Sequence, residues 1–132
     1  MKIQSYLSFN GECENALNFY KNIFGGEIHN TQTYEDQNID IPENYRKKWQ
    51  HAEFKGKGFE FMAYDVAPDT PLNEGNKICM SIDCKDEHEG KEVFEKLSAQ
   101  GKVHTNWQEM SWGDKYGRCS DQYGVQWMVN AK

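Results

Sequence analysis

Residues 26–30 read Gly26-Glu27-Ile28-His29-Asn30, and residues 101–105 repeat the pattern as Gly101-Lys102-Val103-His104-Thr105. Two further echoes occur in the same order along the chain. They pair Ser8-Phe9-Asn10 with Ser81-Ile82-Asp83, and Gly58-Phe59-Glu60-Phe61-Met62-Ala63 with Gly124-Val125-Gln126-Trp127-Met128-Val129. Three echoes in one order indicate an internal duplication, which limits the fold to two similar halves.

Hydrophobic periodicity predicts the same order of elements in both halves, namely a strand, a helix and then further strands. In the first half we expect strands at 6–9, 27–34, 49–54 and 59–65, and a helix that starts near a cap at Asn10 and ends at Gly25. In the second half we expect a helix at 87–99 and strands at 77–83, 102–106, 108–112, 116–120 and 125–131. The polar stretch 35–48 is expected to form the additional loop of the first half.

A linker at residues 67–76 is expected to join the modules 1–66 and 77–132 into a single domain. Neither half alone would bury a large core, because only 37% of the 132 residues are hydrophobic. Large rings compensate in part, with 7 Phe, 7 Tyr and 4 Trp in the chain. We therefore expect an α+β fold whose two halves pack together.

Alternation along the strands assigns each side chain to one of two faces. The residues expected on the core face are Leu7, Phe9, Ala52, Phe54, Phe59, Phe61, Ala63, Ile78, Met80, Ile82, Val125, Trp127 and Val129. The opposite face is expected to carry a mixture of polar, aromatic and sulfur side chains, including Tyr6, His51, Glu53, Met62, Tyr64, Cys79 and Met128. This mixture could form an ordinary solvent-exposed face, but we favour a ligand cleft with a few polar anchors.

Trp112 and Tyr116 belong to a glycine-containing stretch, residues 112–117, that combines large aromatic side chains. This stretch could close over a ligand as a flap. It could equally form a hairpin whose rings pack on the core or on a partner chain. We include both aromatic residues among the candidate ligand-binding residues.

The net charge of −6, with acidic and basic residues interspersed, argues against a nucleic-acid or anionic-membrane partner. No apolar stretch is long enough for a signal segment or a membrane span, so we expect a cytoplasmic protein. The four cysteines show no paired spacing, so free thiols are expected in a reducing cytosol.

Blocks of sequence spread over the whole chain carry a resemblance to a known family. They are residues 6–17, 19–20, 24–27, 51–54, 61–65, 112–114, 116–118 and 121–127. With these blocks the chain resembles the vicinal oxygen chelate superfamily (glyoxalase, bleomycin resistance and dioxygenase proteins), and more closely its PhnB-like branch, labelled 3-demethylubiquinone-9 3-methyltransferase. The resemblance implies two tandem βαβββ modules that form an open curved mixed sheet with helices on the convex side, and a homodimer.

In the superfamily's metalloenzymes, His, Gln or Glu side chains on the first and last strands bind a divalent metal. The cleft-facing candidates on the first strands here are Gln4, Tyr6, Ser8, Cys79 and Ser81. Met62 and Met128 stand where the resemblance expects the final-strand glutamate, and a thioether is a poor ligand for magnesium, manganese or zinc. We therefore expect no metal or other cofactor; if a metal is present, His51, Glu53 and Glu60 would have to hold it.

Three functions remain open from the sequence. We favour a PhnB-like, glyoxalase-fold protein that binds a small molecule in a metal-free cleft. The alternative is a metal-dependent lyase, isomerase or dioxygenase with an unusual ligand set. A third possibility is a metal-free enzyme in which His51, on the same side of a strand as Glu53, acts as general base. A histidine that only hydrogen-bonds at the edge of the cleft is the simpler interpretation. A methyltransferase activity lacks support, because the chain has no glycine-rich strand-to-helix turn for S-adenosylmethionine.

Overall fold

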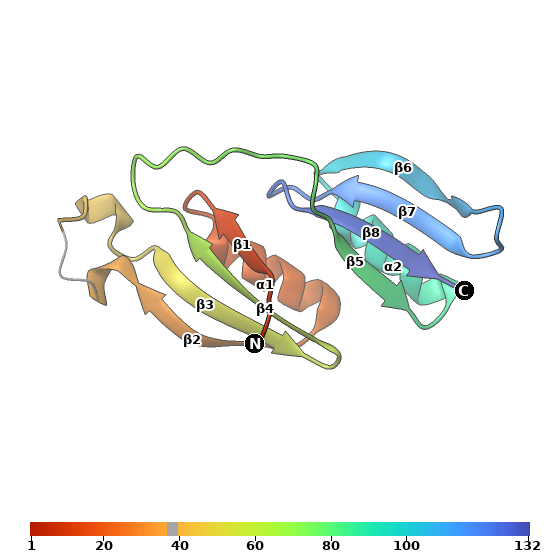
Figure 1. Ribbon diagram of the computed structural model, residues 1–132, viewed down its shortest axis with the longest axis horizontal. Coiled ribbons are helices and arrows are strands. Elements are labelled where there is room, and N and C mark those ends of the chain that lie inside the picture. The colour runs from red at the N-terminus through yellow and green to blue at the C-terminus, as the bar shows by residue number, and fades with distance from the viewer. Residues whose placement is uncertain (37–39) are drawn as a thin grey trace. The chain divides into compact units, whose positions relative to one another are not determined.

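The computed structural model describes residues 1–36 and 40–132, so the expected loop at 35–48 lies partly outside the described residues. The chain divides into two compact units, Met1–Asn73 and Glu74–Lys132 (Figure 1). Each unit contains one helix and one four-stranded sheet. The two units are described separately below.

The N-terminal unit follows the predicted order closely. Its elements are β1 (Tyr6–Phe9), α1 (Cys13–Phe24), β2 (Glu27–Thr33), two short 3₁₀ turns (Tyr34–Asp36 and Glu43–Tyr45), β3 (Trp49–Gly56) and β4 (Phe59–Asp65). The strands lie in the order β1-β4-β3-β2, with β1 parallel to β4 and the other pairs antiparallel. The helix α1 covers one face of this sheet (Figure 1).

The C-terminal unit repeats this arrangement. Its elements are β5 (Met80–Cys84), α2 (Glu87–Ser98), β6 (Lys102–Glu109), β7 (Lys115–Ser120) and β8 (Gln126–Ala131). The strand order β5-β8-β7-β6 has the same single parallel pair, between β5 and β8. The prediction of an α+β fold built from two tandem βαβββ modules is confirmed, with one mixed sheet in each module.

Strand pairing aligns the two modules residue by residue and corrects one of the sequence echoes. Phe9 pairs with Asp65 at the end of β4, and Cys84 pairs with Ala131 at the end of β8. Phe9 and Cys84 therefore occupy equivalent places, and the echo that matched Phe9 with Ile82 was wrong by two residues. A shift of two residues leaves the alternation intact, so the assignment of side chains to faces is unaffected.

Three local predictions in the strands and the helix cap were also wrong. The strand expected at 77–83 begins only at Met80, because β8 begins at Gln126 and offers no partner further upstream; Ile78 is consequently 85% exposed. The stretches 102–106 and 108–112 are not separate strands, since β6 runs through both as far as Glu109 with irregular pairing to β7. Asn10 does not cap α1, which begins at Cys13.

The core of each unit lies between its helix and the helix-facing side of its sheet. In the N-terminal unit the rings of Phe54 and Phe61 pack edge to face at 5.3 Å beneath Leu17 and Tyr20 of α1. In the C-terminal unit Phe94 and Leu97 of α2 and the strand residues Cys119, Trp127 and Val129 are buried. Each fully buried large apolar side chain contributes roughly 1.5–3 kcal/mol to folding. The predicted core faces of β3, β4 and β8 are confirmed.

A buried carboxylate, that of Asp65, takes the place of the expected Asn10 cap. One of its oxygens accepts the backbone N–H of Cys13 at 2.8 Å, and the other accepts the N–H of Trp49 at 3.1 Å. Burial raises the pKa of Asp65, although these backbone N–H groups act in the opposite direction. The last residue of β4 therefore holds both the start of α1 and the start of β3 in place.

We predict that Asp65→Asn lowers the free energy of unfolding by about 1–3 kcal/mol, because an amide has one acceptor oxygen and leaves one buried N–H without a partner. Asp86→Asn is the matched control. Asp86 caps α2 through a single hydrogen bond from the Glu89 N–H, at 2.8 Å, which asparagine can replace. Urea unfolding followed by circular dichroism measures both variants. An equal decrease in the free energy of unfolding in both variants would contradict the bridging role of Asp65.

Candidate functional site

The face of the N-terminal sheet opposite α1 carries most of the residues that the sequence singled out. Tyr6 on β1 pairs with Met62 on β4, and Met62 pairs in turn with Glu53 on β3. These three side chains therefore form one row across the sheet. Tyr64 and His51 belong to the next row along the strands, on the same face.

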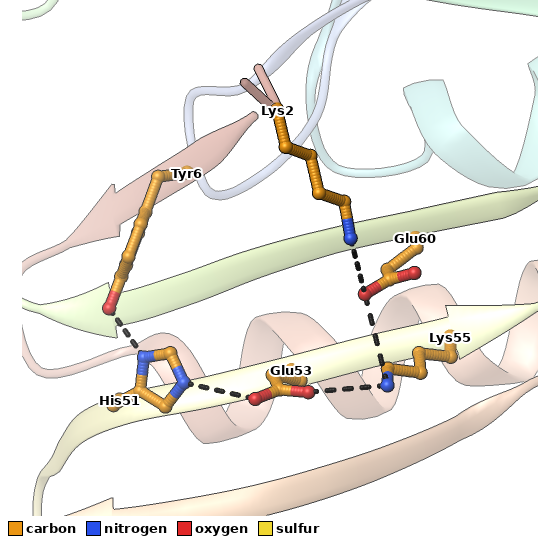
Figure 2. Close-up of polar contacts among 6 residues, drawn as sticks. All are labelled: Lys2, Tyr6, His51, Glu53, Lys55 and Glu60. Carbon is orange, nitrogen blue, oxygen red and sulfur yellow. Dashed lines mark hydrogen bonds and ion pairs between the residues drawn. The ribbon is translucent and has the colours of Figure 1, made fainter. Parts of the chain in front are cut away.

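A continuous line of polar contacts crosses this face (Figure 2). The Tyr6 hydroxyl lies 2.6 Å from His51 Nδ1, and His51 Nε2 lies 3.4 Å from Glu53 Oε2. The other Glu53 oxygen lies 3.4 Å from Lys55 Nζ. The line ends at Glu60, whose Oε1 is 3.8 Å from both Lys55 Nζ and Lys2 Nζ.

The environment of this line sets the charge of its members. Hydrogen bonds from Asn30 and then His51 lower the pKa of Glu53, so this carboxylate is ionised at neutral pH. Burial, followed by the neighbouring Tyr64, raises the pKa of Tyr6, so its hydroxyl stays protonated. The rings of Tyr6 and Tyr64 meet edge to face at 5.0 Å. The face thus presents a phenol, an imidazole and a carboxylate beside aromatic and thioether surface.

The arrangement does not fit a divalent cation held by His51, Glu53 and Glu60. The Lys55 ammonium lies within ion-pair distance of both carboxylates, so it already occupies the position of a cation between them. Both ring nitrogens of His51 have partners. Among residues 1–36 and 40–132, no group of three or more His, Cys, Asp and Glu side chains is placed to hold a metal ion. No chemical step is therefore assigned to a metal at these residues.

The C-terminal sheet has an equivalent face with different side chains. Arg118 on β7 pairs with Met128 on β8, as Glu53 on β3 pairs with Met62 on β4. The Arg118 guanidinium donates to Gln126 Oε1 at 2.6 Å. Equivalent places in the two modules therefore carry a carboxylate in one and a guanidinium in the other, each beside a methionine.

The predicted ligand-binding residues fall into two groups. Five of them, Tyr6, His51, Glu53, Met62 and Tyr64, come together on the N-terminal sheet. The other four belong to the C-terminal unit: Tyr116 and Met128 lie on its open face, Cys79 precedes β5, and Trp112 is 64% exposed in the turn before β7. Whether all nine residues contact one ligand stays a prediction.

Sequence reasoning missed Lys55 and Arg118 as functional candidates. Arg118 alternates with the buried Gly117 and Cys119, so the same alternation that placed Met128 could have placed it. Lys55 could not be found in this way, because its importance lies in its position between two carboxylates on neighbouring strands.

Two expectations about the whole chain concern thiols and membranes. All four cysteines are free, and Cys13 and Cys119 are buried. Within the described part of the chain, no helix has the length and apolar character needed to cross a lipid bilayer.

Comparison with known proteins places the chain in a family. The model of a family described as 3-demethylubiquinone-9 3-methyltransferase matches residues 1–130. The chain is 29% identical over 140 residues to Protein YjdN of Escherichia coli (strain K12), which covers 98% of this chain and 95% of that protein.

Solved structures agree with this assignment. The crystal structure of protein PA1353 from Pseudomonas aeruginosa has a TM-score of 0.87 and 28% identity, covering 99% of this chain and 98% of that one. The PhnB protein from Bacillus cereus, a putative 3-demethylubiquinone-9 3-methyltransferase by its description, has a TM-score of 0.86 and 29% identity over 100% of both chains. A glyoxalase/bleomycin resistance protein/dioxygenase family enzyme from Burkholderia phytofirmans PsJN shares the fold, with a TM-score of 0.64, 12% identity and 96% coverage of both chains. The chain belongs to the PhnB-like family described as 3-demethylubiquinone-9 3-methyltransferase, within the glyoxalase fold.

Proposed function

We propose that this protein binds a small organic molecule on the open face of its N-terminal sheet, without a metal ion. The line from Tyr6 through His51 to Glu53 is the observation that carries the proposal. Tyr6 is 45% exposed, so a ligand can reach its hydroxyl, whose oxygen keeps a lone pair for a ligand donor. Met62 and Tyr64 supply apolar surface beside these polar anchors, a combination typical of ligand sites.

The charges of Tyr6 and Glu53 fix the hydrogen positions on His51. An ionised carboxylate can only accept, so the Nε2 atom that faces Glu53 carries the hydrogen. In a neutral imidazole the Nδ1 atom must then accept, and the Tyr6 hydroxyl donates to it. The polar side chains of this face, Lys55 among them, therefore hold one another in place.

We predict that nitrogen-15 NMR at mildly alkaline pH, where imidazoles are neutral, finds the hydrogen of His51 on Nε2. Tyr6→Phe removes the donor to Nδ1 and should shift the Nδ1 resonance toward that of a free ring nitrogen. His104, whose Nε2 contacts Ser120 Oγ at 2.7 Å, serves as the internal reference and should not change. A hydrogen on Nδ1 in the unaltered protein would contradict the assignment.

We also predict that the protein retains at least one compound when it is incubated with a metabolite extract and separated from unbound molecules by filtration. Mass spectrometry identifies the compound. His51→Ala should weaken its binding at least about tenfold, because a hydrogen-bonding anchor is lost. His104→Ala is the matched control and should retain the compound, as should the protein after dialysis against a chelator.

Two outcomes of this experiment would overturn the proposal. One is equal retention of every compound by the protein and by His51→Ala. The other is a stoichiometric metal ion in the purified protein, measured by elemental analysis, that is lost in His51→Ala. The second outcome would instead favour the metal-dependent alternative.

The proposal extends to a cytoplasmic homodimer, as the family resemblance implies. Exposed apolar side chains, among them Ile3 and Ile78, support an interface between copies of the chain. Light scattering should give twice the chain mass of 15.4 kDa. A monomeric mass at micromolar concentration would contradict this part of the proposal.

A further inference from the structure

Arg118 occupies the middle of the open face of the C-terminal sheet. Its neighbours Gly117 and Cys119 are buried on the side of α2, so Arg118 lies on the opposite face. Met128 is directly across from it on β8, and Tyr116 is two residues away on the same strand. A cationic side chain therefore lies beside aromatic and thioether surface.

Neighbouring groups hold the guanidinium in position but leave donors unused. Arg118 Nη2 donates to Gln126 Oε1 at 2.6 Å, and Gln126 Nε2 donates in turn to the Gly75 carbonyl at 2.7 Å. The Arg118 Nε atom is buried and has no hydrogen-bond partner within the described residues. A buried donor without a partner is unfavourable for folding, and an acceptor on a bound molecule would remove that cost.

The charge of Arg118 is also not balanced. No Asp or Glu within residues 1–36 and 40–132 forms an ion pair with it. By contrast, Lys47, Lys55 and Lys115 have carboxylate partners at 2.8, 3.4 and 3.3 Å. A half-buried charge is normally paired, because partial removal from water disfavours it.

The Cys79 thiol cannot supply the missing negative charge. The guanidinium of Arg118 favours the thiolate. Burial has the larger effect and raises the pKa of Cys79 above its ordinary value, so the thiol stays neutral at physiological pH. Cys79 therefore does not neutralise Arg118, and the guanidinium can accept an anion from another molecule.

We propose that Arg118 binds the carboxylate of a small molecule whose apolar or aromatic body lies against Met128 and Tyr116. A guanidinium matches a planar carboxylate through two parallel hydrogen bonds. One arginine balances one negative charge, whereas a phosphate dianion would require further cations. On this face, β5 carries the acidic Asp83, and a lysine, Lys102, lies at the start of β6.

This inference goes beyond the proposed function, because it assigns a second site, on the C-terminal sheet, and names the class of its ligand. The proposal for Arg118 can fail while the proposed function of the N-terminal sheet holds. The retention experiment with His51→Ala uses no carboxylate probe and tests residues of the N-terminal unit, so a negative result for Arg118 leaves that result unchanged.

The sequence makes a direct experiment possible, because Arg46 and Arg118 are its only arginines. Their two Nε–H signals can be observed by proton–nitrogen NMR at slightly acidic pH and assigned with Arg46→Lys. We expect titration with sodium benzoate to shift the Arg118 signal saturably. Arg46, an exposed residue whose Nη1 lies 3.8 Å from Glu43, is the internal control and should not shift.

Acetate, inorganic phosphate and chloride form the comparison arms of this titration. Benzoate should bind more tightly than acetate, because acetate lacks the apolar body, and phosphate and chloride should give no saturable shift. Equal shifts of both arginine signals, or equal responses to all four anions, would mean unspecific screening and would overturn the proposal.

Two variants test the role of the guanidinium. Arg118→Lys keeps the charge but cannot donate two parallel hydrogen bonds to one carboxylate. It should therefore weaken benzoate binding at least about tenfold, measured by calorimetry. Gln126→Glu leaves Arg118 in place and gives it an internal carboxylate at the present 2.6 Å contact. This variant should abolish benzoate binding, and circular dichroism must confirm that it folds, because glutamate also loses the hydrogen bond from Gln126 Nε2 to the Gly75 carbonyl. Unaltered benzoate binding in either folded variant would contradict the proposal.

Discussion

The parallel pairing of the first strand of each module with its last strand decides which side chains share the open face of each sheet. In the N-terminal module, Tyr6 lies beside Met62 because β1 pairs with β4 in one register, and Glu53 lies beside Met62 because β3 pairs with β4 in another. A slip of one residue would turn His51 and Glu53 toward α1 and bring Ala52 and Phe54 out of the core. Burial of the core therefore fixes the geometry of the candidate site.

The two modules use this shared framework for different chemistry. Glu53 and Arg118 occupy equivalent places, each paired with a methionine of the final strand. The same alignment matches His51 with Tyr116, which pairs with Asn130. The duplication has thus kept the strand pairing and the division into two faces, whereas the charges at this one equivalent place, Glu53 and Arg118, are opposite.

Much of the fold could be predicted from the sequence, because hydrophobic alternation and internal repetition are local patterns. They gave the two modules, the strands β1 and β4 residue for residue, and the core faces. The cap of α1 could not be predicted, because Asp65 reaches Cys13 from 52 residues away along the chain. The exposure of Ile78 was missed for a related reason: a strand ends where its partner ends, and the partner is distant in sequence.

The candidate site was predicted in part. Alternation along the strands placed His51, Glu53 and Met62 on one face. The choice between a metal site and a metal-free site depends instead on Lys55, whose ammonium lies between Glu53 and Glu60. Such a relation between charges on neighbouring strands is not visible in a periodic pattern. The same alternation along the strand could also have placed Arg118 on the open face. Its importance emerges only from the lack of a carboxylate partner among the described residues.

The most direct measurement of the central claim, that side chains alone order the open face of the N-terminal sheet, is anomalous diffraction from crystals soaked separately in manganese and zinc salts. The account predicts no anomalous peak within coordination distance of His51, Glu53 and Glu60, with the Lys55 ammonium still between the two carboxylates. A metal ion bound by His51 and either glutamate, with Lys55 displaced, would contradict it.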